Sequence, residues 1–121
     1  MIKMIKVYEY KGCGTCKKAL KLLDEKKIQY KTFPIRETPP SKSELNKMLG
    51  FLDGNIKRLF NTSGQDYRNL GIKNEINDMT PTMAIDLLSK NGNLIKRPFI
   101  LGKDFGLVGL KEQEWDNIKW S

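Results

Sequence analysis

Cys13 and Cys16, two cysteines separated by two residues, are the side chains in this sequence best suited to carry out a reaction. A cysteine thiolate is a strong nucleophile. A second thiol at this spacing can attack a mixed disulfide or a sulfenic acid formed on the first. The pair therefore indicates redox chemistry, with Cys13 as the nucleophile and Cys16 as the resolving thiol.

The cysteines lie where a predicted strand turns into a predicted helix. Residues 5–10 alternate in the manner of a strand, and the spacing of one helix face follows at Cys16, Ala19, Leu20 and Leu23. Cys13 then falls in the turn, where unpaired N–H groups and the positive end of the helix dipole favour an anion. Positive charge nearby, which also favours a thiolate, comes from Lys11, Lys17 and Lys18.

Three other interpretations of the pair stay open at this point. Two cysteines at this spacing can be inert buried residues, or half of a zinc site. The sequence has no histidine and no further cysteine, so a zinc site would need carboxylates or a second chain. A structural disulfide would close a short loop and would stabilise the fold little. We favour the redox pair and expect no bound metal and no bound cofactor.

Composition limits the class of protein. The chain has 121 residues, of which 39% are hydrophobic and 30% charged, as expected for one soluble domain. No apolar run approaches the roughly 20 residues of a membrane helix, and residues 1–6 are too short and too charged for a signal peptide. We therefore expect a cytoplasmic protein that is a monomer and does not bind membranes. The net charge of +8 comes from scattered lysines, so we expect no direct binding of nucleic acid.

The remaining pattern predicts an α/β protein. Residues 28–35 read as a second strand, which completes a strand-helix-strand unit with the first two elements. Residues 41–94 read mostly as short helices. One opens with a capping box at Ser41 and Glu44, runs through Leu49 and stops at Gly50, and another runs from Thr80-Pro81 to Lys90. Apolar clusters within this stretch are predicted at Ile56, Leu59 and Phe60 and at Tyr67 and Leu70.

The last quarter of the chain predicts a hairpin and a closing helix. Strands are expected at residues 99–101 and 107–109, and a helix at residues 112–120 with Trp115 facing inward. We expect one domain, with a core made of residues 1–38 and 95–121. Residues 39–94 are expected to form a helical insertion packed on that core.

This order of elements, with a CxxC after the first strand and Arg97-Pro98 before the third, resembles a thioredoxin-like fold. More narrowly, the chain resembles the arsenate reductase (ArsC) family and its Spx/MgsR branch. The matching stretches are Cys13 to Ala19, Leu59 to Thr62, Tyr67 to Gly71 and Ile95 to Ile100. Together they cover nearly the whole chain and are specific, although a CxxC alone would be a weak signal.

The resemblance implies roles for several residues. It implies a cis peptide bond before Pro98 and places Arg97 beside Cys13 as an anion or thiolate stabiliser. It also makes Gly14, Thr15, Asn61 and Pro98 candidates for binding the anion or substrate. Arsenate reductases of this type surround one cysteine with three arginines, and this chain has Arg97 at one of these positions. Asn61 and Gly109 stand at the other two, with Arg58 as a candidate substitute in space.

We therefore expect a cytoplasmic thiol-disulfide redox protein that reacts with protein thiols or with a thiol reductant such as glutathione, glutaredoxin or thioredoxin. The first alternative is a redox-sensing transcriptional regulator that binds the C-terminal domain of the RNA polymerase α subunit, to which Spx offers a glycine equivalent to Gly54. The second alternative is a weak arsenate reductase coupled to glutathione or thioredoxin.

Overall fold

Strand β1 (Ile5–Glu9) lies inside a four-stranded sheet whose order is β2-β1-β3-β4. It pairs in parallel with β2 (Tyr30–Pro34) and antiparallel with β3 (Phe99–Leu101), and β3 pairs antiparallel with β4 (Gly106–Val108). The computed structural model describes residues 5–120. Residues 1–4 and Ser121 lie outside this range. The expectation that the N-terminus is no signal peptide therefore concerns mostly residues that the structure does not describe.

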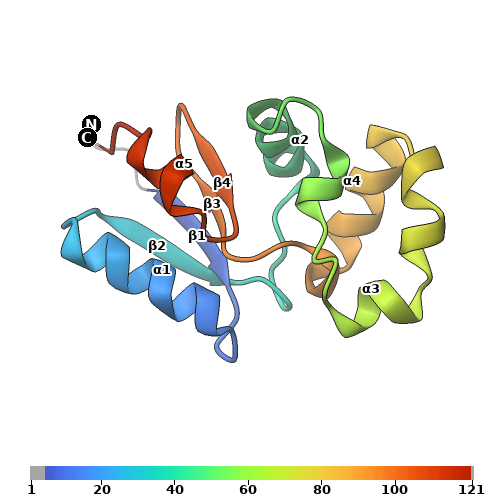
Figure 1. The fold of residues 1–121 in the computed structure, drawn as a ribbon, viewed down its shortest axis with the longest axis horizontal. Coiled ribbons are helices and arrows are strands. Elements are labelled where there is room, and N and C mark those ends of the chain that lie inside the picture. The colour runs from blue at the N-terminus through green and yellow to red at the C-terminus, as the bar shows by residue number, and fades with distance from the viewer. Residues whose placement is uncertain (1–4, 121) are drawn as a thin grey trace.

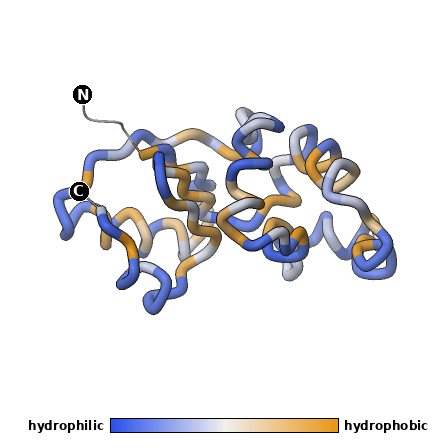
Figure 2. Tube along the Cα trace, turned by 90° about the horizontal axis from the view of Figure 1, so that it is seen from above, coloured by the Kyte–Doolittle hydropathy of each residue, from blue (hydrophilic) through white to orange (hydrophobic). Residues whose placement is uncertain are grey.

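The two faces of the sheet are both apolar and bury different side chains. Ile5, Val7, Ile100 and Leu107 pack on one face with Ala19, Leu23 and Trp115. Tyr8, Phe99, Leu101 and Val108 pack on the other face with the apolar side chains of residues 45–95. Because neighbouring residues of a strand point to opposite faces, each strand contributes to both clusters. Figure 2 shows hydrophobic segments in both halves of the molecule, the half that holds the sheet and the half that is helical.

Helices cover both faces of the sheet (Figure 1). The first face is covered by α1 (Gly14–Glu25) and α5 (Glu112–Asp116). The second face meets a wholly helical stretch made of α2 (Lys42–Phe51), η1 (Ile56–Leu59), α3 (Gln65–Asn69), η2 (Ile72–Asn74), η3 (Ile76–Asp78), α4 (Pro81–Lys90) and η4 (Gly92–Leu94). Within residues 5–120, none of these helices has the length and apolar content needed to cross a membrane.

The α/β class, the order of the elements and the hairpin are confirmed. The predicted caps are confirmed as well. Ser41 and Glu44 form the reciprocal hydrogen bonds of a capping box, and the Thr80 hydroxyl accepts the Met83 N–H at the start of α4.

Several predicted details are wrong. The second strand is shorter than residues 28–35, and the last strand begins and ends one residue earlier than residues 107–109. Helix α2 continues through Gly50 to Phe51 and ends where Asp53 takes the left-handed conformation, with φ of 57°. Leu70 is exposed rather than part of an apolar cluster, although Tyr67 is buried. The closing helix ends at Asp116, before its predicted end at residue 120.

Glu44 joins the sheet to the helical stretch. Its carboxylate accepts hydrogen bonds from the Tyr8 hydroxyl at 2.7 Å and the Lys6 ammonium at 3.0 Å, both on β1. It also accepts the Ser41 N–H at the start of α2. Burial alone would raise the pKa of Glu44, but these three hydrogen bonds outweigh it and hold the pKa below its ordinary value. Burial and the same contact raise the pKa of Tyr8.

We predict that Glu44→Gln lowers the free energy of unfolding by about 1 to 2 kcal/mol at neutral pH, because hydrogen bonds to a charged acceptor are lost. Because the pKa of Glu44 is lower in the folded chain than in the unfolded chain, its ionisation stabilises the folded state. This contribution is complete at pH values above the unfolded pKa of about 4.3. This contribution disappears as pH falls through the folded-state pKa. The difference in unfolding free energy between the natural chain and Glu44→Gln should therefore shrink on acidification, which denaturant unfolding at a series of pH values would measure.

The control is Glu75→Gln, which changes an exposed carboxylate. An equal and pH-independent loss in both variants would contradict the prediction.

Candidate active site

Cys13 caps the N-terminus of α1, and its sulfur faces the first turn. The side chain accepts a hydrogen bond from the backbone N–H of Cys16 at 3.2 Å, which is one of the N–H groups that the start of a helix leaves unpaired. The Cys13 N–H donates to the carbonyl oxygen of Tyr10 at 3.0 Å, and this bond closes the turn after β1. Cys13 is half-buried, whereas Cys16 is buried.

Cys16 lies beneath Cys13 on the buried side of α1. Its side chain is fully buried, together with Ala19 and Leu23 of the same helix. Burial, and then the hydrogen bond and charge of Cys13, raise the pKa of the Cys16 thiol to about 12. Cys16 therefore stays protonated near neutral pH. The two neighbouring thiols also differ in exposure, because Cys13 is half-buried and Cys16 is buried.

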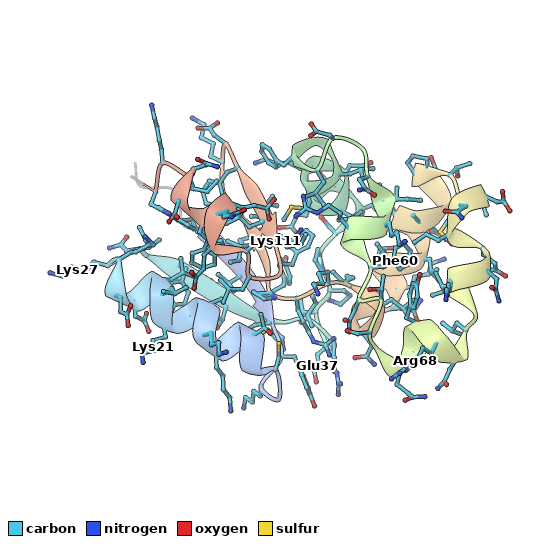
Figure 3. The ribbon with its side chains drawn as sticks, viewed as in Figure 1. Lys21, Lys27, Glu37, Phe60, Arg68 and Lys111 are labelled. Carbon is cyan, nitrogen blue, oxygen red and sulfur yellow. The ribbon has the colours of Figure 1, made fainter. Side chains whose placement is uncertain are left out.

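The segment that carries Arg97 is held between the helical stretch and the sheet. The Lys96 N–H donates to the Leu59 carbonyl oxygen and the Asn61 N–H donates to the Leu94 carbonyl oxygen, each at 2.7 Å. A β-bridge joins Ile95 to the buried Phe60, which is labelled in Figure 3. The Arg97-Pro98 peptide bond is cis, as the resemblance implied. Pro98 is buried, and its carbonyl oxygen accepts the Gly109 N–H at 2.9 Å.

Arg97 lies against the ring of Tyr10, three residues before Cys13. Its guanidinium carbon is 5.2 Å from the ring centroid, and its Nη1 atom is buried with no hydrogen-bond partner in the described chain. The guanidinium carbon of Arg36, two residues after β2 ends, lies over the same ring at 3.7 Å from its centroid. Sequence reasoning missed Tyr10 and Arg36. The signal that could have found them is the predicted strand-helix-strand unit. Its two strands pair in parallel, so the residues that follow β1 and β2 lie at the same end of the sheet.

The other predicted site residues occupy two places. Gly14 and Thr15 are exposed in the first turn of α1, where their backbone N–H groups have no acceptor within the helix. Asn61 lies in the turn before α3, and its side-chain oxygen accepts a hydrogen bond from the Ser63 hydroxyl at 3.5 Å. Only Gly14 and Thr15 are thus adjacent to Cys13 along the chain.

Arg58 and Gly109 do not supply the missing cations in this arrangement. The Arg58 guanidinium donates to both oxygens of Glu114 at 2.9 and 3.0 Å, so a carboxylate already neutralises it. Gly109 has a φ of 71°, which disfavours any side chain, and a Cβ there would be 3.0 Å from the stem of Lys96. Arg97 is therefore the one arginine present at the three matched positions.

Gly54 has a structural role at the end of α2. Its φ is 79°, and its N–H donates to the Leu49 carbonyl oxygen at 2.9 Å. The Asp53 N–H donates to the Gly50 carbonyl oxygen at 3.3 Å, which completes the pair of bonds that closes a helix C-terminus. Termination of this helix accounts for the glycine without any binding partner.

We predict that Cys13 reacts with iodoacetamide more than about 100 times faster than Cys16 in the folded chain, because only a thiolate reacts and Cys16 is buried with a raised pKa. Timed alkylation at pH 8 followed by peptide mass spectrometry would measure both rates. In guanidinium chloride the two rates should converge, since unfolding removes the burial. Equal rates in the folded protein would overturn the assignment of the nucleophile.

Comparison with known proteins agrees with this fold. The sequence is 38% identical over 109 residues to the uncharacterized protein YusI of Bacillus subtilis, covering 90% of this chain and 92% of that protein. It is 26% identical over 111 residues to the global transcriptional regulator Spx of Streptococcus agalactiae, covering 92% and 80%. The crystal structure of a possible arsenate reductase from Streptococcus mutans superposes with a TM-score of 0.85 at 33% identity, covering 95% and 99%. The ArsC family model matches residues 8–118, and the chain therefore belongs to the ArsC family.

Proposed function

We propose that the protein is a cytoplasmic thiol-disulfide oxidoreductase in which Cys13 attacks and Cys16 resolves. The observation that carries the proposal is the arrangement of the pair at the start of α1. Cys13 accepts the Cys16 N–H and is half-buried, whereas Cys16 is fully buried in the first turn of the same helix. Similarity to the structure of a possible arsenate reductase, a name that denotes a reducing enzyme, supports the same class of chemistry.

The reaction has two exchange steps. The Cys13 thiol loses its proton and attacks one sulfur of a substrate disulfide, whose S–S bond breaks, and the released thiolate takes up a proton. Cys16 then loses its proton and attacks the Cys13 sulfur, which frees the second substrate thiol. Two electrons pass from the protein to the substrate, and the protein pair becomes a disulfide. A thiol reductant such as glutathione, glutaredoxin or thioredoxin would return it to the dithiol form.

Burial is the first cause of the raised pKa of Cys16, so the second exchange step requires this buried thiol to lose its proton beside the Cys13 mixed disulfide. Arg97, Gly14 and Thr15 are proposed to hold the anionic group of a reactant, and Pro98 to shape the loop opposite Cys13.

A redox-sensing regulator is the second candidate, supported by the similarity to Spx. In that case the same two cysteines would be the sensor, and the output would be binding to the RNA polymerase α subunit. Gly54, the residue expected at such a contact, is already explained by the end of α2. A binding measurement between the reduced or oxidised chain and the isolated C-terminal domain of the polymerase α chain would separate this candidate from an enzyme.

We predict that mild oxidation forms one disulfide within the chain, because the two cysteines are in contact at the first turn of α1. Intact-mass spectrometry should show a loss of about 2 Da, which corresponds to the two hydrogens removed. With glutathione disulfide as the oxidant, Cys16→Ser should abolish this loss and leave a mixed disulfide between Cys13 and glutathione, with one glutathione thiol released. Oxidation that produced only dimers linked between chains would contradict the proposed pairing.

We predict weak arsenate reduction at most. Arsenate near neutral pH is a dianion or monoanion, and each charged hydrogen bond removed from its site costs about 1.5–3 kcal/mol. Arg97 is the one matched arginine, since Asn61 is neutral and Arg58 is paired with Glu114. A coupled glutathione or thioredoxin assay should show no saturation at low millimolar arsenate, and Arg97→Ala should remove any activity. Turnover of several per second with a submillimolar KM, within the usual range for enzymes, would contradict this prediction.

A further inference from the structure

Two arginines, Arg36 and Arg97, lie over the ring of Tyr10. The resemblance to arsenate reductases predicted a role for Arg97 only. The guanidinium carbons of Arg36 and Arg97 are 3.7 and 5.2 Å from the ring centroid, distances at which a cation is attracted to an aromatic face. The ring also covers Gly12, because a Cβ on that glycine would be 2.6 Å from the ring carbon Cε2. Both cations therefore stand beside the loop that contains Cys13.

The backbone that carries Arg36 is fixed on two sides. The Ile35 N–H donates to the Glu9 carbonyl oxygen at 2.9 Å, which extends the pairing of β1 with β2 beyond the strands. On the other side Gly92 lies so close that a Cβ there would collide with the Ile35 carbonyl oxygen and be 3.0 Å from the Cα of Arg36. Gly92 opens the segment that leads to Arg97. The two arginines are thus held by backbone contacts as well as by the ring.

Within the described part of the chain, the two guanidinium groups have no carboxylate to neutralise them. Across residues 5–120, the ion pairs between side chains involve Lys6, Lys42, Arg58 and Lys90, and neither Arg36 nor Arg97. The Nη1 atom of Arg97 is also buried and has no hydrogen-bond partner among these residues. Two like charges on one ring repel each other, and a buried donor without a partner is unfavourable. A bound anion would relieve both.

We infer that Arg36 and Arg97, held on the ring of Tyr10, form an arginine clamp that binds a carboxylate of the thiol or disulfide reacting at Cys13. This inference rests on the proposed function of Cys13. The planar, forked donors of arginine match the two oxygens of a carboxylate. Arg36 is then the residue that selects acidic low-molecular-mass thiols and their disulfides over neutral and cationic ones.

The test compares three disulfides of similar size that differ in charge. These are dithiodipropionate, which is anionic, hydroxyethyl disulfide, which is neutral, and cystamine, which is cationic. The rate at which Cys13 ceases to be a free thiol is measured for each by alkylation quench and mass spectrometry at constant ionic strength. Each rate is divided by the rate of mercaptoethanol with the same disulfide, which removes intrinsic differences in reactivity. The readout is the ratio of the anionic to the neutral rate within one variant.

We expect this ratio to exceed one in the natural chain and to fall about tenfold in Arg36→Gln, because one forked donor is lost. Tyr10→Leu should lower it similarly, and Tyr10→Phe should restore it because the aromatic face returns. The matched control is Arg68→Gln, which removes the same charge from an exposed arginine on α3, in the helical part of the molecule (Figure 3).

The outcomes separate the clamp from the chemistry on which it rests. An equal fall in Arg36→Gln and Arg68→Gln would show that net charge alone attracts the anion, and would overturn the clamp. A ratio of one in the natural chain would overturn it as well. Failure of Cys13 to react with any of the three disulfides would overturn the proposed function, and the clamp with it.

Discussion

Hydrogen bonding along both edges of β1 is the constraint on which the site depends. One edge pairs in parallel with β2 and the other antiparallel with β3. The CxxC loop leaves the carboxyl end of β1, Arg36 follows the carboxyl end of β2, and Arg97 precedes β3. In a parallel pair the two carboxyl ends lie side by side, and in an antiparallel pair the carboxyl end of one strand lies beside the amino end of the other. All three segments therefore lie at the same end of the strands.

The site is anchored through its buried half. Cys16, Ala19 and Leu23 are fully buried on α1, so the helix rests on the sheet with its N-terminus at the point where β1 ends. Burial of this kind stabilises the fold and also separates the two thiols chemically. The same residue, Cys16, thus supplies packing in the reduced protein and a second sulfur within one helical turn of the first.

Pairing of charges distinguishes this site from an oxyanion site with three arginines. Arg58 is neutralised by Glu114, and a lysine stem covers Gly109. The arginines at the carboxyl end of β1 are instead Arg36 and Arg97, which share the ring of Tyr10 rather than a carboxylate. A fold that keeps its framework but redistributes arginines in this way would retain thiol chemistry while changing the anion it accepts.

The sequence by itself determined the order of the elements and the place of the cysteine pair between a strand and a helix. Local patterns are sufficient for these, since a CxxC between a strand and a helix, a capping box at Ser41 and Glu44, and Thr80-Pro81 each act within a few residues. The exposure of Leu70 and the true end of α2 were not predicted, because both depend on what packs nearby. Only the tertiary structure decided that Arg58 pairs with Glu114, 56 residues away, and that Arg36 and Arg97 meet on Tyr10. These contacts join segments far apart in the chain, and the spacing of residues in a sequence does not specify which side chains meet when a sheet brings such segments together.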